Sequence, residues 1–215
     1  MGSIYFPSCN FTAASPEAAE KIREYLQVKM PVAGCCRVDQ LDFPKGSTAV
    51  YFCQACRETL IARAGGRFVL QNLFEYLNED PDYPWPDYSG LTVTVQDCWR
   101  DRAHPEISDA VRMALQKMHV SVIEMIETRA RSKFCGNLHF EPQNPNSVKL
   151  LEPYNGKPLY ELPEDVQRTL MQEQVGKLPC DLAVTYCNRC KAGLLAGGGK
   201  AVHLLELATG MFASS

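Results

Sequence analysis

The chain has 215 residues, of which 46% are hydrophobic, and its 22 Lys and Arg against 25 Asp and Glu give a formal net charge of −3. Such a chain buries a core without covalent cross-links, so its ten cysteines are not needed for stability. The charge balance argues against nucleic acid or an anionic membrane as the main partner, and no apolar run reaches the roughly 18 residues of a membrane span. We expect a cytoplasmic protein that recognises small molecules or other proteins.

The first 80 residues alternate segments typical of strands and helices. Strands are predicted where β-branched and aromatic residues gather, and Ser15-Pro16 offers a cap and a first-turn proline for a helix. In chain order, the expected elements are a strand over 4–6, a helix over 16–26, a strand over 49–52, a helix opened by the Cys-x-x-Cys motif at 53–56, and a helix over 73–77 after two glycines. Alternating strands and helices predict a parallel sheet.

A proline-rich linker, 81–90, is expected to precede a second half, 91–215, in which the same order of elements returns. These elements are a strand over 92–95, a helix capped by Ser108 and running through Met118, a strand over 182–186, the Cys-x-x-Cys motif at 187–190, and a helix over 204–208 after three glycines. An insertion occupies about 141–178. We therefore predict an α/β fold of two related halves, each a small, mostly parallel sheet flanked by helices.

The cysteines fall into two runs of parallel order. The first run is Cys9, Cys35, Cys36, Cys53 and Cys56; the second is Cys98, Cys135, Cys187 and Cys190, with Cys180 left over. Disulfides, zinc and iron–sulfur clusters compete as explanations. A disulfide framework suits small secreted chains that lack a core, and adjacent cysteines do not readily bridge each other. The runs therefore favour metal sites at the carboxyl ends of the strands, where both Cys-x-x-Cys motifs are expected.

The order Cys, Cys-Cys-Gly, Cys-x-x-Cys, occurring twice, resembles the cysteine-rich CCG-domain family that includes the B-type subunit of heterodisulfide reductase. The stretches 6–9, 97–98 and 203–207 also resemble this family, and the match spans nearly the whole chain. In members with the full motif, each set of five cysteines holds a noncubane iron–sulfur cluster, and two such clusters cleave a disulfide; other members bind zinc or a simpler cluster. The resemblance implies an oxidoreductase subunit for a small thiol, disulfide or sulfur substrate, with a ferredoxin-like or flavin-containing subunit as electron donor.

Two departures from the family pattern limit this expectation. The first half has all five thiols but Arg37 in place of the glycine, whereas the second keeps Gly136 but has Phe134 in place of a cysteine. The resemblance thus implies a noncubane cluster at the first site, and the four thiols of the second site suit a four-iron cubane or zinc. Cys180 is predicted to be a packed thiol. The alternative function is a non-catalytic electron carrier or a zinc-stabilised interaction module.

Overall fold

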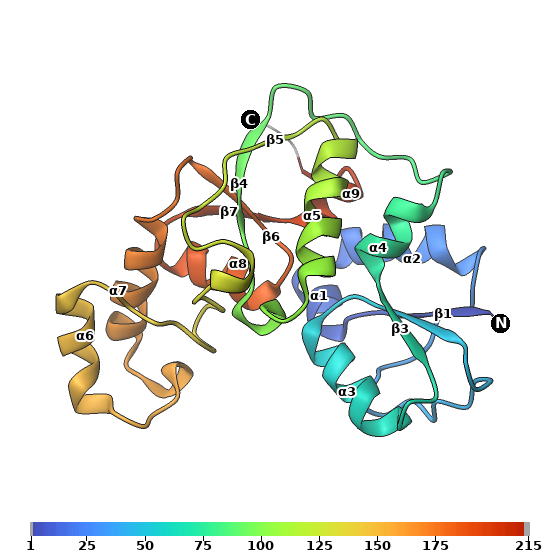
Figure 1. Ribbon diagram of the computed structural model, residues 1–215, viewed down its shortest axis with the longest axis horizontal. Coiled ribbons are helices and arrows are strands. Elements are labelled where there is room, and N and C mark those ends of the chain that lie inside the picture. Colours follow the sequence, from blue (N-terminus) through green and yellow to red (C-terminus); the bar gives the residue numbers. More distant parts are fainter. Residues whose placement is uncertain (1, 213–215) are drawn as a thin grey trace.

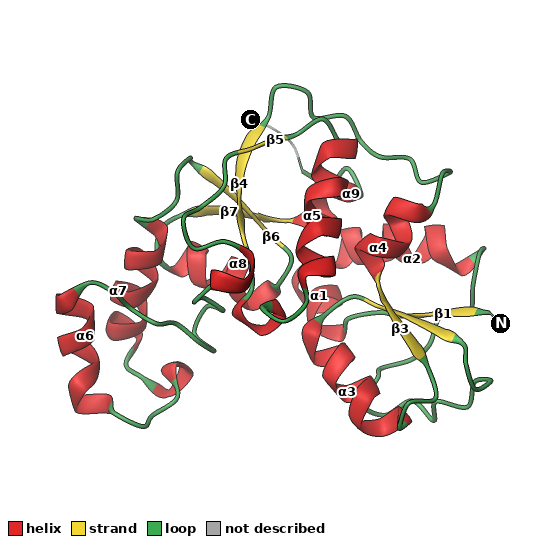
Figure 2. Ribbon diagram, viewed as in Figure 1, coloured by secondary structure: helices red, strands yellow, loops and turns green. Residues whose placement is uncertain are grey.

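The structure, a computed structural model, describes residues 2–212 and contains two parallel sheets (Figure 1). The first has the order β1-β2-β3, with β1 (Ser3–Phe6), β2 (Thr48–Tyr51) and β3 (Val69–Asn72). The second has the order β5-β4-β6-β7, with β4 (Thr92–Gln96), β5 (Ser121–Val122), β6 (Leu182–Thr185) and β7 (Lys200–His203). Helices flank both sheets (Figure 2), which confirms the predicted α/β class.

The helices of the first half are α1 (Cys9–Ala14), α2 (Pro16–Gln27), α3 (Gln54–Ala64) and α4 (Leu73–Glu79). The predicted helix after Ser15 is present with Pro16 in its first turn, but the Ser15 side chain makes no capping hydrogen bond. Its hydroxyl donates instead to Glu206, 191 residues away, at the first turn of the last helix. A tertiary contact has therefore replaced the predicted cap.

The helices of the second half are α5 (Pro105–Lys117), α6 (Pro145–Leu151), α7 (Glu164–Val175), α8 (Asn188–Ala196) and α9 (Leu204–Ala208), and the 3₁₀ turns are η1 (Trp99–Asp101), η2 (Arg129–Arg131), η3 (Glu152–Tyr154) and η4 (Leu159–Glu161). The prediction that Ser108 caps α5 is wrong. Pro105 takes the first turn, where no backbone N–H donor is needed, and the Ser108 hydroxyl donates to the Pro105 carbonyl.

The strands β1-β2-β3 and β4-β6-β7 share one topology. In both, a cysteine closely follows the first strand, a Cys-x-x-Cys motif begins the helix after the second, and the third strand ends in a capping box. The capping residues also occupy equivalent positions in the two sheets. Asn72 pairs with Tyr51 at the end of β2, and His203 pairs with Thr185 at the end of β6. The second sheet adds β5, and α6 and α7 extend from it at the end of the molecule far from the first sheet (Figure 1). That the halves arose by duplication stays a prediction.

One apolar core joins the two halves. Alternate residues of the first sheet, such as Tyr5 and Val50, share a cluster with Val95 and Val184 of the second sheet, while the other face of the first sheet packs in a smaller cluster. The segment 81–90 contains neither helix nor strand, yet the buried Tyr83 hydroxyl donates to the Ala208 carbonyl at 2.7 Å. The halves are thus packed against each other.

No helix within residues 2–212 has both the length and the apolar character that crossing a membrane requires.

Candidate metal centres

Four buried cysteines meet beyond the carboxyl ends of β4 and β6. Their Sγ atoms all lie within 4.8 Å of one another, and none of the side chains is more than 6% exposed; they are Cys98, Cys135, Cys187 and Cys190. Within residues 2–212, this is the one group of three or more potential metal ligands packed so closely. The structure therefore brings together all four cysteines predicted for the second site.

A glycine allows the Cys135 loop to lie against α8. Gly136 has a φ of +56°, and a Cβ atom there would stand 2.1 Å from the carbonyl oxygen of Arg189. Gly193 of α8 faces the same loop, since its Cβ would lie 2.6 Å from the Gly136 Cα. In the first half, Arg37 does not adopt a positive φ, because its loop turns through hydrogen bonds to the Cys35 carbonyl instead. The glycine missing from the first half is thus not required by the backbone there.

The four thiols of the second site do not share negative charge evenly. Hydrogen bonds from the neighbouring thiols, that of Cys135 foremost, lower the pKa of Cys187 well below its usual value. Burial, followed by hydrogen bonding with Cys135, raises the pKa of Cys190 far above its usual value. Like charges so close in a buried site repel, so four thiolates need a compensating cation. This donor set fits a bound metal ion or iron–sulfur cluster.

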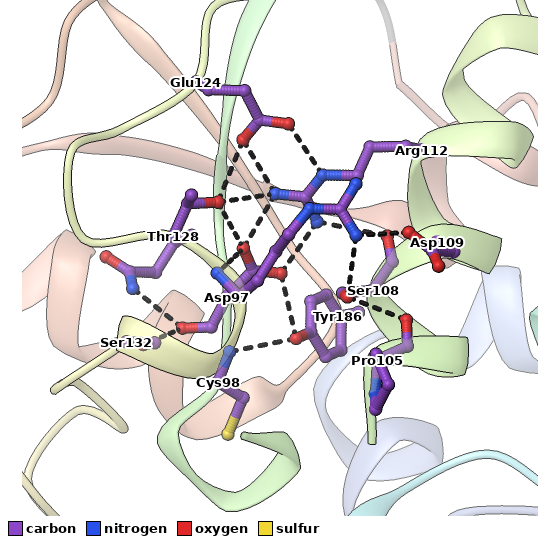
Figure 3. Close-up of polar contacts among 12 residues, drawn as sticks. Asp97, Cys98, Pro105, Ser108, Asp109, Arg112, Glu124, Thr128, Ser132 and Tyr186 are labelled. Carbon is purple, nitrogen blue, oxygen red and sulfur yellow. Dashed lines mark hydrogen bonds and ion pairs between the residues drawn. The ribbon is translucent and has the colours of Figure 1, made fainter. Parts of the chain in front are cut away.

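A hydrogen-bond network behind the second site fixes the chain at two of its cysteines (Figure 3). The Tyr186 hydroxyl accepts from the Cys98 backbone N–H at 3.1 Å and donates to an Asp97 oxygen at 3.1 Å. Arg112 donates to both Asp97 carboxylate oxygens, at 2.8 and 2.7 Å. Burial alone would raise the pKa of Asp97, but the bonds and charge of Arg112 outweigh it and lower the pKa.

Sequence reasoning missed this network. Its one local signal is that Asp97 and Tyr186 each stand directly before a cysteine at the end of a buried strand. The other members, Arg112 of α5, Glu124 and Thr128, come from elsewhere in the chain.

The five cysteines of the first site are spread more widely. Cys9 and Cys35 form a pair with an Sγ–Sγ distance of 3.9 Å, while Cys56 lies 3.4 Å from Cys36 and 3.3 Å from Cys53. Cys53 caps α3 by accepting the Cys56 backbone N–H. The hydrogen bond from the Cys56 thiol, together with that amide, lowers the pKa of Cys53 to about 6. The structure therefore places all five near one another without the compactness of the second site, and their role as ligands stays a prediction.

The two sites differ in exposure. Cys9 is exposed, Cys35 and Cys53 are half-buried, and only Cys36 and Cys56 are buried. A groove of about 570 Å³ runs along Cys9 and Cys35. At the second site, α7 packs on α8, with the Met171 sulfur against Gly193, and all four cysteines belong to the main core. The insertion thus packs on the helix that begins at the second site, and that site is buried, whereas the first lies beside an open groove.

A small cavity and an ion pair connect the sites. The cavity, of about 40 Å³, is lined by Cys53 from the first site and Cys187 from the second. Beside these sites, Arg57 of α3 donates to Asp101 at 2.6 Å, and both side chains are buried. Gln54 donates to the same carboxylate. The helix that carries the first Cys-x-x-Cys motif is therefore tied to the loop after Cys98.

Three other side chains that could bind a metal or an anion are not part of the four-cysteine group, although the His139 carbonyl accepts the Cys135 backbone N–H. Cys180 is half-buried, its thiol faces the Leu182 carbonyl at 3.6 Å, and burial raises its pKa, as a packed thiol requires. His139 stacks on Trp99 at 3.8 Å between ring centroids and pairs with Glu141. The Arg102 guanidinium lies over the Trp99 ring.

Comparisons of the chain with protein-family models, with curated proteins and with solved structures find no match.

Proposed function

We propose that the chain is an iron–sulfur oxidoreductase subunit of the heterodisulfide reductase type, acting on a thiol, disulfide or sulfur substrate at the first site. The main support for the proposal is that an open, five-cysteine site and a buried, four-cysteine site lie on either side of one small cavity. An open site admits a substrate sulfur, whereas a sealed site excludes water from a redox centre.

Each set of residues has a part in this proposal. Cys36, Cys53 and Cys56 would hold the inner side of a noncubane cluster, and Cys9 and Cys35 its outer side toward the groove. Such a cluster supplies one-electron chemistry beside a substrate sulfur. The four buried cysteines would hold a cubane, with Asp97 and Tyr186 fixing the backbone of Cys98.

The proposed electron donor is a ferredoxin-like or flavin-containing subunit in the cytoplasm. The resemblance implies this donor, and the sequence contains no glycine fingerprint for a nucleotide cofactor of its own. In the proposal, electrons pass between the sealed and the open site across the short gap that Cys53 and Cys187 line.

A second candidate, a zinc-stabilised interaction module, is favoured by distances at the second site. Sulfur atoms that each lie roughly 2.3 Å from a tetrahedral zinc are roughly 3.8 Å apart. The Cys98–Cys135 and Cys135–Cys187 Sγ distances, 3.5 and 3.9 Å, match that spacing. A cubane, which carries its thiolates on different iron atoms, requires these sulfurs to move apart.

The deciding experiment measures iron, acid-labile sulfide and zinc per chain on anaerobically purified protein. The wild-type chain is compared with Cys36→Ala and Cys135→Ala, which remove one thiol from the first and second sites. We expect iron with matching sulfide in the wild-type chain, beyond the content of a single cubane, and a partial loss in each variant. Zinc without sulfide would reject the oxidoreductase, and an unchanged metal content and spectrum in Cys36→Ala would reject a five-thiolate site.

A further inference from the structure

The groove beside the first site points to a specific class of ligand. We propose that it binds a small zwitterionic thiol, such as a cysteine-containing peptide, with the sulfur toward Cys9 and Cys35 and the charged groups toward Glu20 and Arg23 of α2. This inference rests on the proposed function and names the substrate class of its open site.

The size of the two cavities decides where a substrate is held. The cavity between the sites, about 40 Å³, has room for no more than a few water molecules, since one water needs roughly 10–15 Å³ of such space. The groove, about 570 Å³, lies within the range of small-molecule sites. A ligand larger than a few atoms therefore approaches the thiols from the groove.

The groove is lined by apolar side chains and by two thiols. Its walls include Pro7, Ala13, Ala19, Val32 and Ala33, small side chains that leave room for a ligand's carbon atoms. Cys9 and Cys35, the adjacent pair of the first site, line the same space. A ligand sulfur in the groove is thus brought beside the exposed Cys9 and the half-buried Cys35.

The lining of the groove includes one acidic and one basic side chain. Glu20 and Arg23 lie one turn apart on α2, their closest N–O distance is 3.6 Å, and their side chains are 58% and 54% exposed. A loose, solvated pair of this kind contributes little to stability, so exchanging it for new partners costs little. A carboxylate that meets Arg23 and an ammonium that meets Glu20 satisfy both groups at once, which an uncharged thiol does not.

The test compares two thiols on the metal-loaded protein: reduced glutathione, which is zwitterionic, and 2-mercaptoethanol, which is uncharged. Binding is followed by isothermal titration and by the change in visible absorption. Arg23→Gln and Glu20→Gln are each expected to weaken glutathione binding by roughly two- to fivefold, the range of exposed ion pairs, and to leave 2-mercaptoethanol binding and metal content unchanged. Glu24→Gln, on the same helix but outside the groove, is the matched control.

The outcomes separate this inference from the proposed function. Equal glutathione affinity in the wild-type chain, Arg23→Gln and Glu20→Gln would overturn the inference, as would an equal loss in Glu24→Gln. A second outcome is glutathione binding by calorimetry that these two variants weaken, without a change in visible absorption on adding either thiol. That outcome would support the groove as a thiol-binding site and reject a reactive cluster beside it. No binding of glutathione by either method would reject the groove.

Discussion

The two cysteine sites show how the same arrangement of strands and cysteines gives opposite environments. Each site lies beyond a parallel sheet and uses a Cys-x-x-Cys motif at the start of a helix. The second site is buried throughout, but the first leaves Cys9 exposed and Cys35 half-buried. In the second half α7 packs on α8, the helix after the motif, whereas in the first half a groove between α1, α2 and the loop at 32–35 reaches Cys9 and Cys35.

Close contacts at two glycines fix how α7 packs on α8. In α8, Gly193 faces the Met171 sulfur of α7, and a Cβ atom at Gly197 would stand 2.5 Å from the Met171 carbonyl oxygen. Asn137, two residues after Cys135, donates to Gln167 of α7 at 3.1 Å. The insertion therefore packs against the elements that carry the second site. Substitutions that weaken one site selectively test whether the buried and the open site differ as described.

The largest effect is expected from Gly136→Ala. The new Cβ would meet the Arg189 carbonyl oxygen at 2.1 Å in a backbone with a φ of +56°, so strain and overpacking together cost roughly 4 kcal/mol of unfolding free energy. Gly65→Ala, with a φ of +54° and nothing within 4 Å, is the matched control and costs roughly 1 kcal/mol. Urea unfolding of the metal-free chains measures both, and equal losses would show that the Cys135 loop does not press on α8.

Arg57→Met tests whether the open and sealed sites depend on each other. It leaves Asp101 buried without its cation, which costs roughly 3 kcal/mol, and it leaves Gln54 as the remaining donor from α3 to that carboxylate. We expect metal loss at both sites. The control, Arg100→Met, removes an ion pair with the more exposed Glu58 and costs roughly 1 kcal/mol or less. Metal analysis after dialysis measures the outcome, and loss from the first site alone would contradict the coupling.

Tyr186→Phe weakens the sealed site through one hydroxyl. Removing it leaves the buried Cys98 N–H without a partner and takes one of several donors from Asp97, which costs roughly 1–2 kcal/mol and lowers metal affinity at the second site roughly 10- to 100-fold. Tyr83→Phe deletes another buried hydroxyl, on the Ala208 carbonyl away from both sites. Chelator competition distinguishes the variants: a similar metal affinity in both would mean that the Tyr186 hydroxyl only supports the fold.

The smallest perturbation is alkylation of the folded, metal-free chain with iodoacetamide. We expect Cys35 and Cys53, half-buried thiols whose pKa values hydrogen bonds lower, and the exposed Cys9 to react first, and the four cysteines of the second site to react only after local unfolding. Half-buried Cys180 provides an internal reference. Peptide mass spectrometry over time gives the order, and labelling of Cys135 as fast as Cys9 would break the distinction between an open and a sealed site.

Local composition and spacing were enough to predict most elements and the grouping of the cysteines. Strand positions such as 49–52 and the helix after Cys53 follow from local composition and spacing, so they were predicted with small shifts at their ends. The four cysteines of the second site were also predicted as a group, because the ends of parallel strands lie together. Local patterns failed at two serines. The Ser15 hydroxyl bonds to the distant Glu206 instead of capping its helix, and α5 begins at Pro105 rather than after Ser108.

Which of the two sites is open depends on long-range packing. The sequence assigned the insertion 141–178 no fixed place, and in the structure Met171 of this insertion packs on α8. The sequence likewise indicated neither the hydrogen bond from Tyr186 to Asp97 nor the groove along α2. Exposure and buried hydrogen bonds depend on residues that meet across long stretches of chain, and local composition does not encode which of those segments pack together.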